Sequence, residues 1–202
     1  MGVNLSKTSH VIFFAGVLPV LSLALAWGAS KAMPNPPFWA ETLSPLLAYA
    51  ILYGVFEKYL WSWEIFRLLG VSDSPDLRGR WEGAQRSSYK QDGSNVAVPS
   101  VLEIRQSFNN IFVSAYYEKS QSSSIAASFV AVNGNRYLFY TYDSDPNSMQ
   151  EGTMQIHKGT VKLAYVPQGK KLIGAYFNSI GNRGDMEFSF AGRELLNRFA
   201  HS

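Results

Sequence analysis

The sequence contains no cysteine and very little histidine. Without cysteine the chain forms no disulfide, uses no thiol nucleophile and holds no zinc through sulfur. Its three histidines, His10, His157 and His201, lie far apart in the sequence, so a histidine metal cluster is not expected. The net charge of +3 is too small to indicate a nucleic-acid partner, and we expect no binding to DNA or RNA.

Motifs of catalysis are also missing. The chain has no Gly-x-Ser-x-Gly, no His-Glu-x-x-His and no Walker loop. Residues 143–147 imitate the start of a calcium loop, but Ser148 replaces the required glycine and Met154 the final acid. Glu82 and Glu103 alternate out of phase with their apolar neighbours, so no pair of carboxylates is expected inside the domain. The sequence therefore predicts a binding protein, not an enzyme, with no metal or cofactor.

Charge is absent from residues 11–29, a run long enough to cross a bilayer as a helix. A second apolar segment, residues 38–60, has an uncharged centre bounded by Glu41 and Glu57. Three prolines within residues 31–37 cannot continue a helix, so they predict a sharp bend between the two segments. Aromatic rings that suit the membrane interface flank the second segment: Trp39, Tyr59, Trp61 and Trp63. We therefore predict a transmembrane helical hairpin with an interfacial extension over residues 1–70.

Two other interpretations of this region stay open. Ala24 to Ala26 resembles a signal-peptidase site, so the first run can be a secretory signal. The second interpretation is a soluble protein with buried helices. A core helix normally has a polar stripe, however, and the first run has none. For a hairpin, the lysines and arginines before the first span and after the second predict that both termini are cytoplasmic.

After a linker at residues 71–78, the pattern changes to short runs rich in valine, isoleucine, phenylalanine and tyrosine, separated by turn residues. Short connections force neighbouring strands to be antiparallel. Eight or nine such strands over residues 79–202 predict a small closed antiparallel β-barrel of about eight strands, because closure removes the sheet edges. A sandwich is the alternative. The predicted strands are 79–90, 99–107, 110–118, 123–132, 135–142, 151–158, 160–166, 171–178 and 184–191, with a turn at His157 to Gly159.

Alternation along these strands predicts which side chains point into the barrel. The apolar parity places polar groups at one mouth, above an apolar floor. An eight-stranded barrel is just wide enough for one small ligand. The same parity turns Arg80, Arg86 and Arg105 outward, as surface charges. The ligand-binding residues predicted in this way are Gln106, Tyr117, Ser124, Ser128, Tyr140, Tyr142, Tyr176 and Asn178. The alternative is that these side chains only fill the interior.

The barrel domain begins with residues 77–83, which read Leu-Arg-Gly-Arg-Trp-Glu-Gly and contain a Gly-x-Trp-x-Gly directly behind the two apolar segments. Further matching segments are residues 102–106, 110–113, 137–142, 152–154 and 172–178, with a late Gly184. This layout resembles the SMODS-associating two-transmembrane, β-strand-rich effectors of bacterial CBASS antiphage systems.

The resemblance implies a minimal β-barrel that senses a cyclic oligonucleotide messenger, most simply a cyclic dinucleotide, made by a partner nucleotidyltransferase. It also implies an inner-membrane protein that forms homo-oligomers, disrupts the lipid bilayer and causes abortive infection. A membrane-anchored, lipocalin-like carrier of a lipid or small hydrophobe is the alternative function, and a purely structural membrane subunit is a third.

Small residues at four-residue spacing let membrane helices approach closely. A carboxylate near the end of a span reaches the interface or finds a partner in a helix bundle. On these grounds the predicted oligomerisation residues are Ser22, Ala26, Ser44, Ala48, Gly54 and Glu57.

Overall fold

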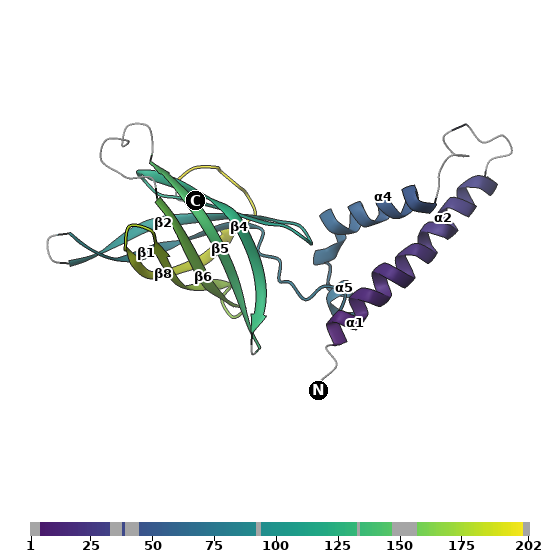
Figure 1. Ribbon diagram of the computed structural model, residues 1–202, viewed down its shortest axis with the longest axis horizontal. Helices are drawn as coiled ribbons and strands as arrows, with labels where there is room; N and C mark the ends of the chain where they lie inside the picture. Colours follow the sequence, from purple (N-terminus) through teal and green to yellow (C-terminus); the bar gives the residue numbers. More distant parts are fainter. Residues whose placement is uncertain are drawn as a thin grey trace. The chain divides into compact units, whose positions relative to one another are not determined.

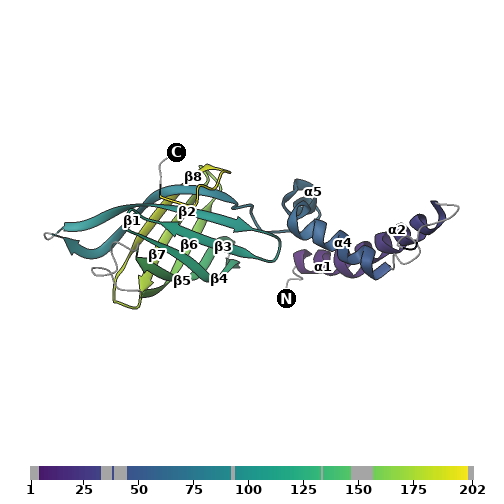
Figure 2. The ribbon, with the colours of Figure 1, turned by 90° about the horizontal axis from the view of Figure 1, so that it is seen from above.

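The computed structural model describes residues 5–32, 38, 45–91, 94–132, 134–146 and 157–199. The chain divides into two compact units. The first comprises Met1–Asp76 together with Ser107–Asn109, and the second comprises Leu77–Gln106 and Asn110–Ser202. The first unit is mainly helical and the second is built of strands (Figures 1 and 2).

The helical unit opens with one continuous stretch made of α1 (Leu5–Ile12), the π-helix η1 (Phe13–Val17) and α2 (Leu18–Ala32). Pro19 has no N–H to offer the carbonyl of Ala15, which lies inside the π-helix, and the wider π turn accommodates this missing bond. Over Ser9–Ala32 the helix is 24 residues long and apolar enough to span a membrane. The prediction of an apolar N-terminal helix is confirmed.

A second span is not shown. Helix α4 (Pro45–Lys58) has 14 residues. At 1.5 Å per residue such a helix extends about 21 Å, short of a hydrocarbon core of about 30 Å. Ser44 and most of the predicted bend lie outside the described residues. Within the described ranges there is thus one candidate span, and residues 39–44 of the predicted second segment lie outside those ranges.

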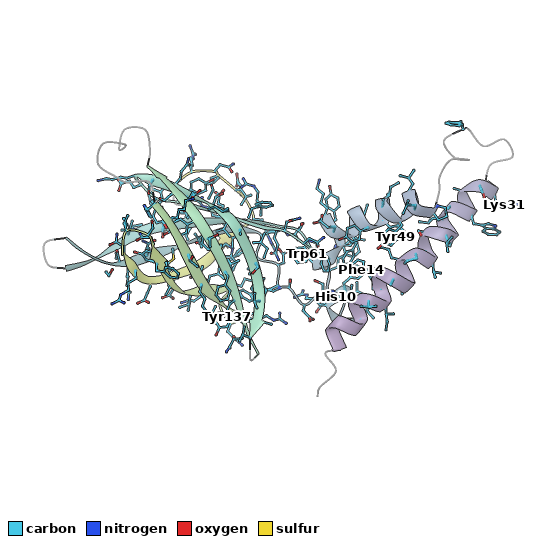
Figure 3. The ribbon with its side chains drawn as sticks, in the orientation of Figure 1. His10, Phe14, Lys31, Tyr49, Trp61 and Tyr137 are labelled. Carbon is cyan, nitrogen blue, oxygen red and sulfur yellow. The ribbon has the colours of Figure 1, made fainter. Side chains whose placement is uncertain are left out.

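Helices α2 and α4 pack against each other through small side chains. Ser22 and Ala26 of α2 and Ala48 of α4 are buried at this contact. Their small size therefore serves packing within one chain, and in this conformation they are not exposed to a second copy. Gly54 differs, because it is exposed and no atom lies within 4 Å of the position that a Cβ would occupy there. Tyr49 also joins the helices, since its hydroxyl donates to the carbonyl of Phe14 (3.4 Å; Figure 3).

Below this contact an aromatic cluster closes the helical unit, where η2 (Leu60–Ser62) and α5 (Glu64–Leu68) follow α4. Phe108, from Ser107–Asn109, lies 5.1 Å from Phe56 and 5.6 Å from Phe14, measured between ring centroids. Glu57 holds the same segment, because its carboxylate accepts the Ser107 hydroxyl and its carbonyl accepts the Phe108 N–H at 2.9 Å. The carboxylate predicted to serve oligomerisation is thus used inside the unit.

The strands of the second unit form a closed barrel in which each strand pairs with the next and β8 pairs with β1, all antiparallel (Figure 2). The predicted closed barrel of about eight strands is confirmed, and the sandwich is excluded. The strands are β1 (Gly79–Gln91), β2 (Ser94–Gln106), β3 (Ile111–Tyr116), β4 (Ser120–Val132), β5 (Asn135–Pro146), β6 (His157–Val166), β7 (Lys171–Asn178) and β8 (Arg183–Gly192).

The predicted turn at His157 to Gly159 is wrong. Strand β6 runs straight through these residues, with Gly159 paired to Tyr142 of β5. Gly159 is there because a Cβ at this position would collide with the Tyr142 ring. The remainder of the predicted strand 151–158 lies outside the described residues.

One end of the barrel interior is an apolar core. Trp81 anchors it, donating its ring N–H to the Leu77 carbonyl at 2.9 Å and meeting Phe190 edge to face. Around it lie the buried side chains of Leu102, Ile104, Val113, Leu138, Leu163, Leu172, Met186 and Phe188. The predicted apolar floor is therefore packed solid with side chains.

A buried ion pair lies on the outer face of the barrel. Arg80 Nη1 donates to Glu103 Oε1 at 2.9 Å, and the two side chains are 3% and 0% exposed. The C-terminal segment covers this pair, because the N–H groups of Leu196 and Asn197 donate to the same carboxylate at 2.8 and 3.0 Å. Arg80 was predicted to be a surface charge. Strand parity correctly predicts that the Arg80 side chain points outward. The segment that covers it could not be foreseen, because Leu196 lies 93 residues after Glu103 in the sequence.

Candidate functional site

Four tyrosines meet inside the barrel at the end opposite Trp81. Tyr140 and Tyr142 are alternate residues of β5, Tyr176 is on β7, and Tyr117 directly follows β3. The rings of Tyr140 and Tyr142 are 6.3 Å apart between centroids. The hydroxyls of all four are close enough to influence one another electrostatically. Three strands of one barrel thus bring phenol groups together in a single polar end.

Two of the hydroxyls are fixed by neighbours on β1. Tyr117 donates to Gln85 Oε1 at 2.9 Å, and Tyr176 donates to Ser87 Oγ at 3.0 Å. For Tyr140 and Tyr142 there is no hydrogen bond from the hydroxyl to any residue in the described ranges. Among the described residues, the site therefore has two phenols whose hydroxyls are held in place and two whose hydroxyls are not.

Glycines make room for two of the rings. Gly159 lies opposite Tyr142 on β6, and a Cβ there would overlap the phenol ring. Gly184 lies opposite Tyr176 on β8, where a Cβ would collide with the Arg86 carbonyl oxygen of β1 and would also lie 3.0 Å from Tyr176 Cε1. An aromatic ring that lies over a cross-strand glycine covers bare backbone and fixes the register of the strands.

Burial keeps these phenols neutral. Desolvation, followed by the influence of Tyr142 and Tyr176, raises the pKa of Tyr117 above its ordinary value. Burial likewise raises the pKa of Tyr140 well above that value and the pKa of Tyr142 to about 12. At neutral pH the hydroxyls of Tyr117, Tyr140 and Tyr142 therefore keep their protons and are hydrogen-bond donors.

Serines extend the polar end. Ser122 and Ser144 face each other across β4 and β5, and both are buried. Ser100 of β2 is 0% exposed, and its hydroxyl has no hydrogen-bond partner among the described residues. The His157 ring contacts Tyr142 edge to face at 6.2 Å. The result is a belt of hydrogen-bond donors and acceptors around the interior.

Of the residues predicted from sequence, the four tyrosines are brought together. Ser124 faces the interior, but its hydroxyl accepts the N–H of Val113 at 3.0 Å and so serves the pairing of β3 with β4. Asn178 is half-buried at the end of β7, where its side chain accepts the N–H of Asn182 at 2.9 Å and holds a turn.

Two placements are wrong. Gln106 is the last residue of β2, at the Trp81 end, and its side chain accepts the N–H of Leu77 at 2.8 Å. Ser128 is exposed on the outer face, because a bulge between Ser124 and Ala126 reverses the alternation of β4. A bulge adds one residue to one strand, and sequence parity cannot detect it.

Several residues of the belt are absent from the predicted set of binding residues. The inward parity of Trp81 along β1 already includes Gln85, and it continues to Ser87. Ser100, Ser122 and Ser144 follow the inward parity of Leu102, Ser124 and Tyr142, but single serines in a strand are also common at the surface. His157 lies where the sequence predicts a turn. No group of three or more metal-binding side chains occurs in the part of the chain that the structure describes.

A separate groove of about 340 Å³ lies on the outside of the barrel, across β1, β7 and β8. Its charged lining residues are Glu82, Arg86, Asp185 and Glu187. Three carboxylates beside one arginine do not favour an anionic ligand. We therefore take the tyrosine end, and not the groove, as the candidate binding site.

Comparison with known proteins agrees with this geometry. Residues 72–189 match the family model described as Cap15, cyclic dinucleotide receptor domain. The chain is also 25% identical over 186 residues to the CD-NTase-associated protein 15 of Staphylococcus schleiferi, covering 89% of this chain and 95% of that protein.

Proposed function

Because the chain belongs to the family of the Cap15 cyclic dinucleotide receptor domain, a family of CBASS effectors, we propose that its barrel binds a cyclic dinucleotide at the tyrosine end. The observation that carries the proposal is the group of four tyrosines that converge from β5, from β7 and from the residue that follows β3. Phenol rings stack on nucleobases, and their hydroxyls donate to phosphate or base oxygens.

The polar belt supplies what such a ligand requires. The ligand carries two phosphate charges, which neutral phenols accommodate better than tyrosinates would. In the described residues no lysine or arginine is buried on the inner face, so hydroxyl and amide donors contact the ligand there. A lipid carrier is less well supported, because its apolar half would have to be empty and here it is filled by Trp81, Phe188 and their neighbours.

Isothermal titration calorimetry of the full-length chain in detergent micelles tests this function. We expect heat of binding with at least one of cyclic di-AMP, cyclic di-GMP and cyclic di-UMP, and none with the linear dinucleotide of the same bases. Absence of binding to every cyclic dinucleotide refutes the proposal. Binding of a fluorescent fatty acid in their place would favour the carrier.

We also propose the membrane arrangement predicted from the sequence, in which a two-span hairpin over residues 1–70 is followed by a linker at 71–78 and a cytoplasmic receptor domain at 79–202. Its support is the outward apolar surface of both helices. Val20 and Leu23 of α2 are 64% and 56% exposed, and Leu46 and Ile51 of α4 are 77% and 53% exposed. Such surface is costly in water and favourable in lipid. Protease protection in inverted bacterial inner-membrane vesicles tests the orientation, since a protected C-terminus contradicts it.

For assembly we propose that copies associate through α4 and that association disrupts the bilayer. Ser22, Ala26 and Ala48 are committed within one chain, whereas Ala50 and Gly54 form an exposed small-residue face of α4. Crosslinking in membranes with and without cyclic dinucleotide tests this. Gly54→Leu is expected to reduce ligand-dependent oligomers, and Gly28→Leu on α2 is the matched control. Dye leakage from vesicles without any oligomer contradicts the mechanism.

The partner that makes the messenger is proposed to be a cyclic-dinucleotide-forming nucleotidyltransferase. The name of the Staphylococcus schleiferi relative associates that protein with such an enzyme. Co-expression of this chain with an active nucleotidyltransferase is expected to stop growth, whereas an inactive enzyme is expected to leave growth unchanged. Equal growth in both cases contradicts the link.

A further inference from the structure

Ser100 presents a buried hydroxyl that the fold itself does not use. It lies on the inner face of β2, opposite Gly83 of β1, and is 0% exposed. No described residue forms a hydrogen bond with its Oγ. A buried hydroxyl without a partner is unfavourable, so its presence in an otherwise well-packed barrel points to a molecule that binds there.

Gln85 lies beside it on β1 and has a fixed amide. Gln85 pairs with Val98, two residues before Ser100 on β2, so the two side chains are diagonal neighbours on the inner face. Tyr117 donates its hydroxyl to Gln85 Oε1 at 2.9 Å. Because the amide oxygen is held by Tyr117, the amide presents its two N–H donors on the opposite side.

We propose that Gln85 and Ser100 form the subsite that reads the base of the bound cyclic dinucleotide, and that Tyr117 is a positioning residue for the Gln85 amide. This inference rests on the proposed function. An N–H group fixed in one direction donates well to a keto oxygen and opposes an amino group, because two donors then face each other. The subsite therefore prefers a keto base, guanine or uracil, to an amino base, adenine or cytosine.

The Ser100 hydroxyl adds affinity rather than selectivity. A hydroxyl rotates and is both donor and acceptor, so it can serve either kind of base. Removal of this hydroxyl is expected to weaken the binding of every cyclic dinucleotide about equally. The same change is expected to leave the melting temperature equal or slightly raised, since it removes a buried group that has no partner in the described structure.

The experiment is calorimetry of the full-length chain with cyclic di-GMP, cyclic di-UMP and cyclic di-AMP. Wild type is expected to bind a keto-base ligand about tenfold more tightly than cyclic di-AMP, the effect of roughly one hydrogen bond. Tyr117→Phe keeps the ring, frees the amide to rotate, and is expected to remove most of this preference. Gln85→Glu replaces the donors with acceptors and is expected to reverse the preference. Ser100→Ala is expected to weaken all three ligands, and Gln121→Glu, exposed on the outside of β4, is the matched control.

The outcomes separate this inference from the function on which it rests. A wild-type preference for cyclic di-AMP, or a preference that Tyr117→Phe leaves intact, overturns the subsite while the receptor function stands. Unchanged affinity in Ser100→Ala overturns the role of that hydroxyl. If wild type binds no cyclic dinucleotide, both proposals fail. Because Tyr117→Phe retains the packing of the ring, the test does not depend on whether Gln85→Glu folds.

Discussion

Removing one hydroxyl from the tyrosine end separates a role in ligand binding from a role in folding. Tyr140 is 3% exposed, and its hydroxyl has no hydrogen bond to any described residue. Tyr140→Phe therefore removes no hydrogen bond found in the described structure and leaves the ring, which fills the interior. We expect the free energy of unfolding to change by no more than about 0.5 kcal/mol, as for a substitution that disturbs no packing.

The effect on binding is expected to be much larger. A hydrogen bond to a charged group such as phosphate contributes about 1.5–3 kcal/mol, which is roughly 10- to 150-fold in the dissociation constant. We expect Tyr140→Phe to weaken binding of the cyclic dinucleotide by this factor, while the melting temperature of the full-length chain stays within about 3 °C of that of wild type.

The matched control is Tyr137→Phe. Tyr137 is three residues earlier on β5 and points outward, where Lys162 Nζ lies 4.4 Å from its ring centroid (Figure 3). The same chemical change there is expected to leave affinity unaltered. Calorimetry and thermal unfolding of wild type and both variants decide the matter. Equal affinity in all three proteins, or equal losses in both variants, refutes the assignment of Tyr140 to the binding site.

Three further predictions concern stability. Glu103→Gln breaks a fully buried ion pair with Arg80 and is expected to lower the free energy of unfolding by about 3–5 kcal/mol. Glu187→Gln removes an exposed pair with Lys171 and should leave the chemical unfolding curve almost unchanged. Similar unfolding curves for the two variants would contradict the role of the buried pair. Burial raises the pKa of Tyr142 to about 12, so stability is fully present below the ordinary tyrosine value near 10 and is lost as pH rises from there through 12. Melting temperatures measured against pH should show this loss of stability, and Tyr142→Phe should make the loss smaller. Identical pH profiles for wild type and Tyr142→Phe would show that burial of this phenol does not cause the loss. Gly159→Ala places a methyl group against the Tyr142 ring and is expected to lower both the stability of the protein and its affinity for the ligand. Gly192→Ala is the control, because the position of its Cβ is open space, and it should alter neither. The opposite ranking of the two variants would show that the Tyr142 ring does not depend on Gly159.

The barrel was predictable because its signals are local and repeated. Alternating apolar residues and short turns recur along the whole domain, and closure follows from the need to pair the edges. The inward tyrosines followed from the same parity, since Tyr140 and Tyr142 share a face with Leu138. The family predicted from the sequence is also confirmed.

What was missed depends on long-range or irregular features. A bulge at Ile125 turned Ser128 outward, and no pattern in the sequence marks it. Gly159 was interpreted as a turn residue because glycine is common in turns, but here it accommodates a ring from another strand. Arg80 was assigned to solvent because its cover, the segment at residues 193–199, comes from the far end of the chain. Small residues at four-residue spacing do mark a packing surface, and three of them, Ser22, Ala26 and Ala48, are buried within one chain. Their predicted role in oligomers stays a prediction.

The central claim, that the cyclic dinucleotide binds inside the barrel among the tyrosines, is tested most directly by photocrosslinking. An azido-substituted cyclic dinucleotide is bound to the full-length chain, irradiated, and located by mass spectrometry of the peptides. Labelling is expected at residues of the belt, above all Tyr142 and Tyr176, and unmodified ligand is expected to compete with it. Competed labelling confined to the outer groove, at Ile173 or Asp185, would contradict it.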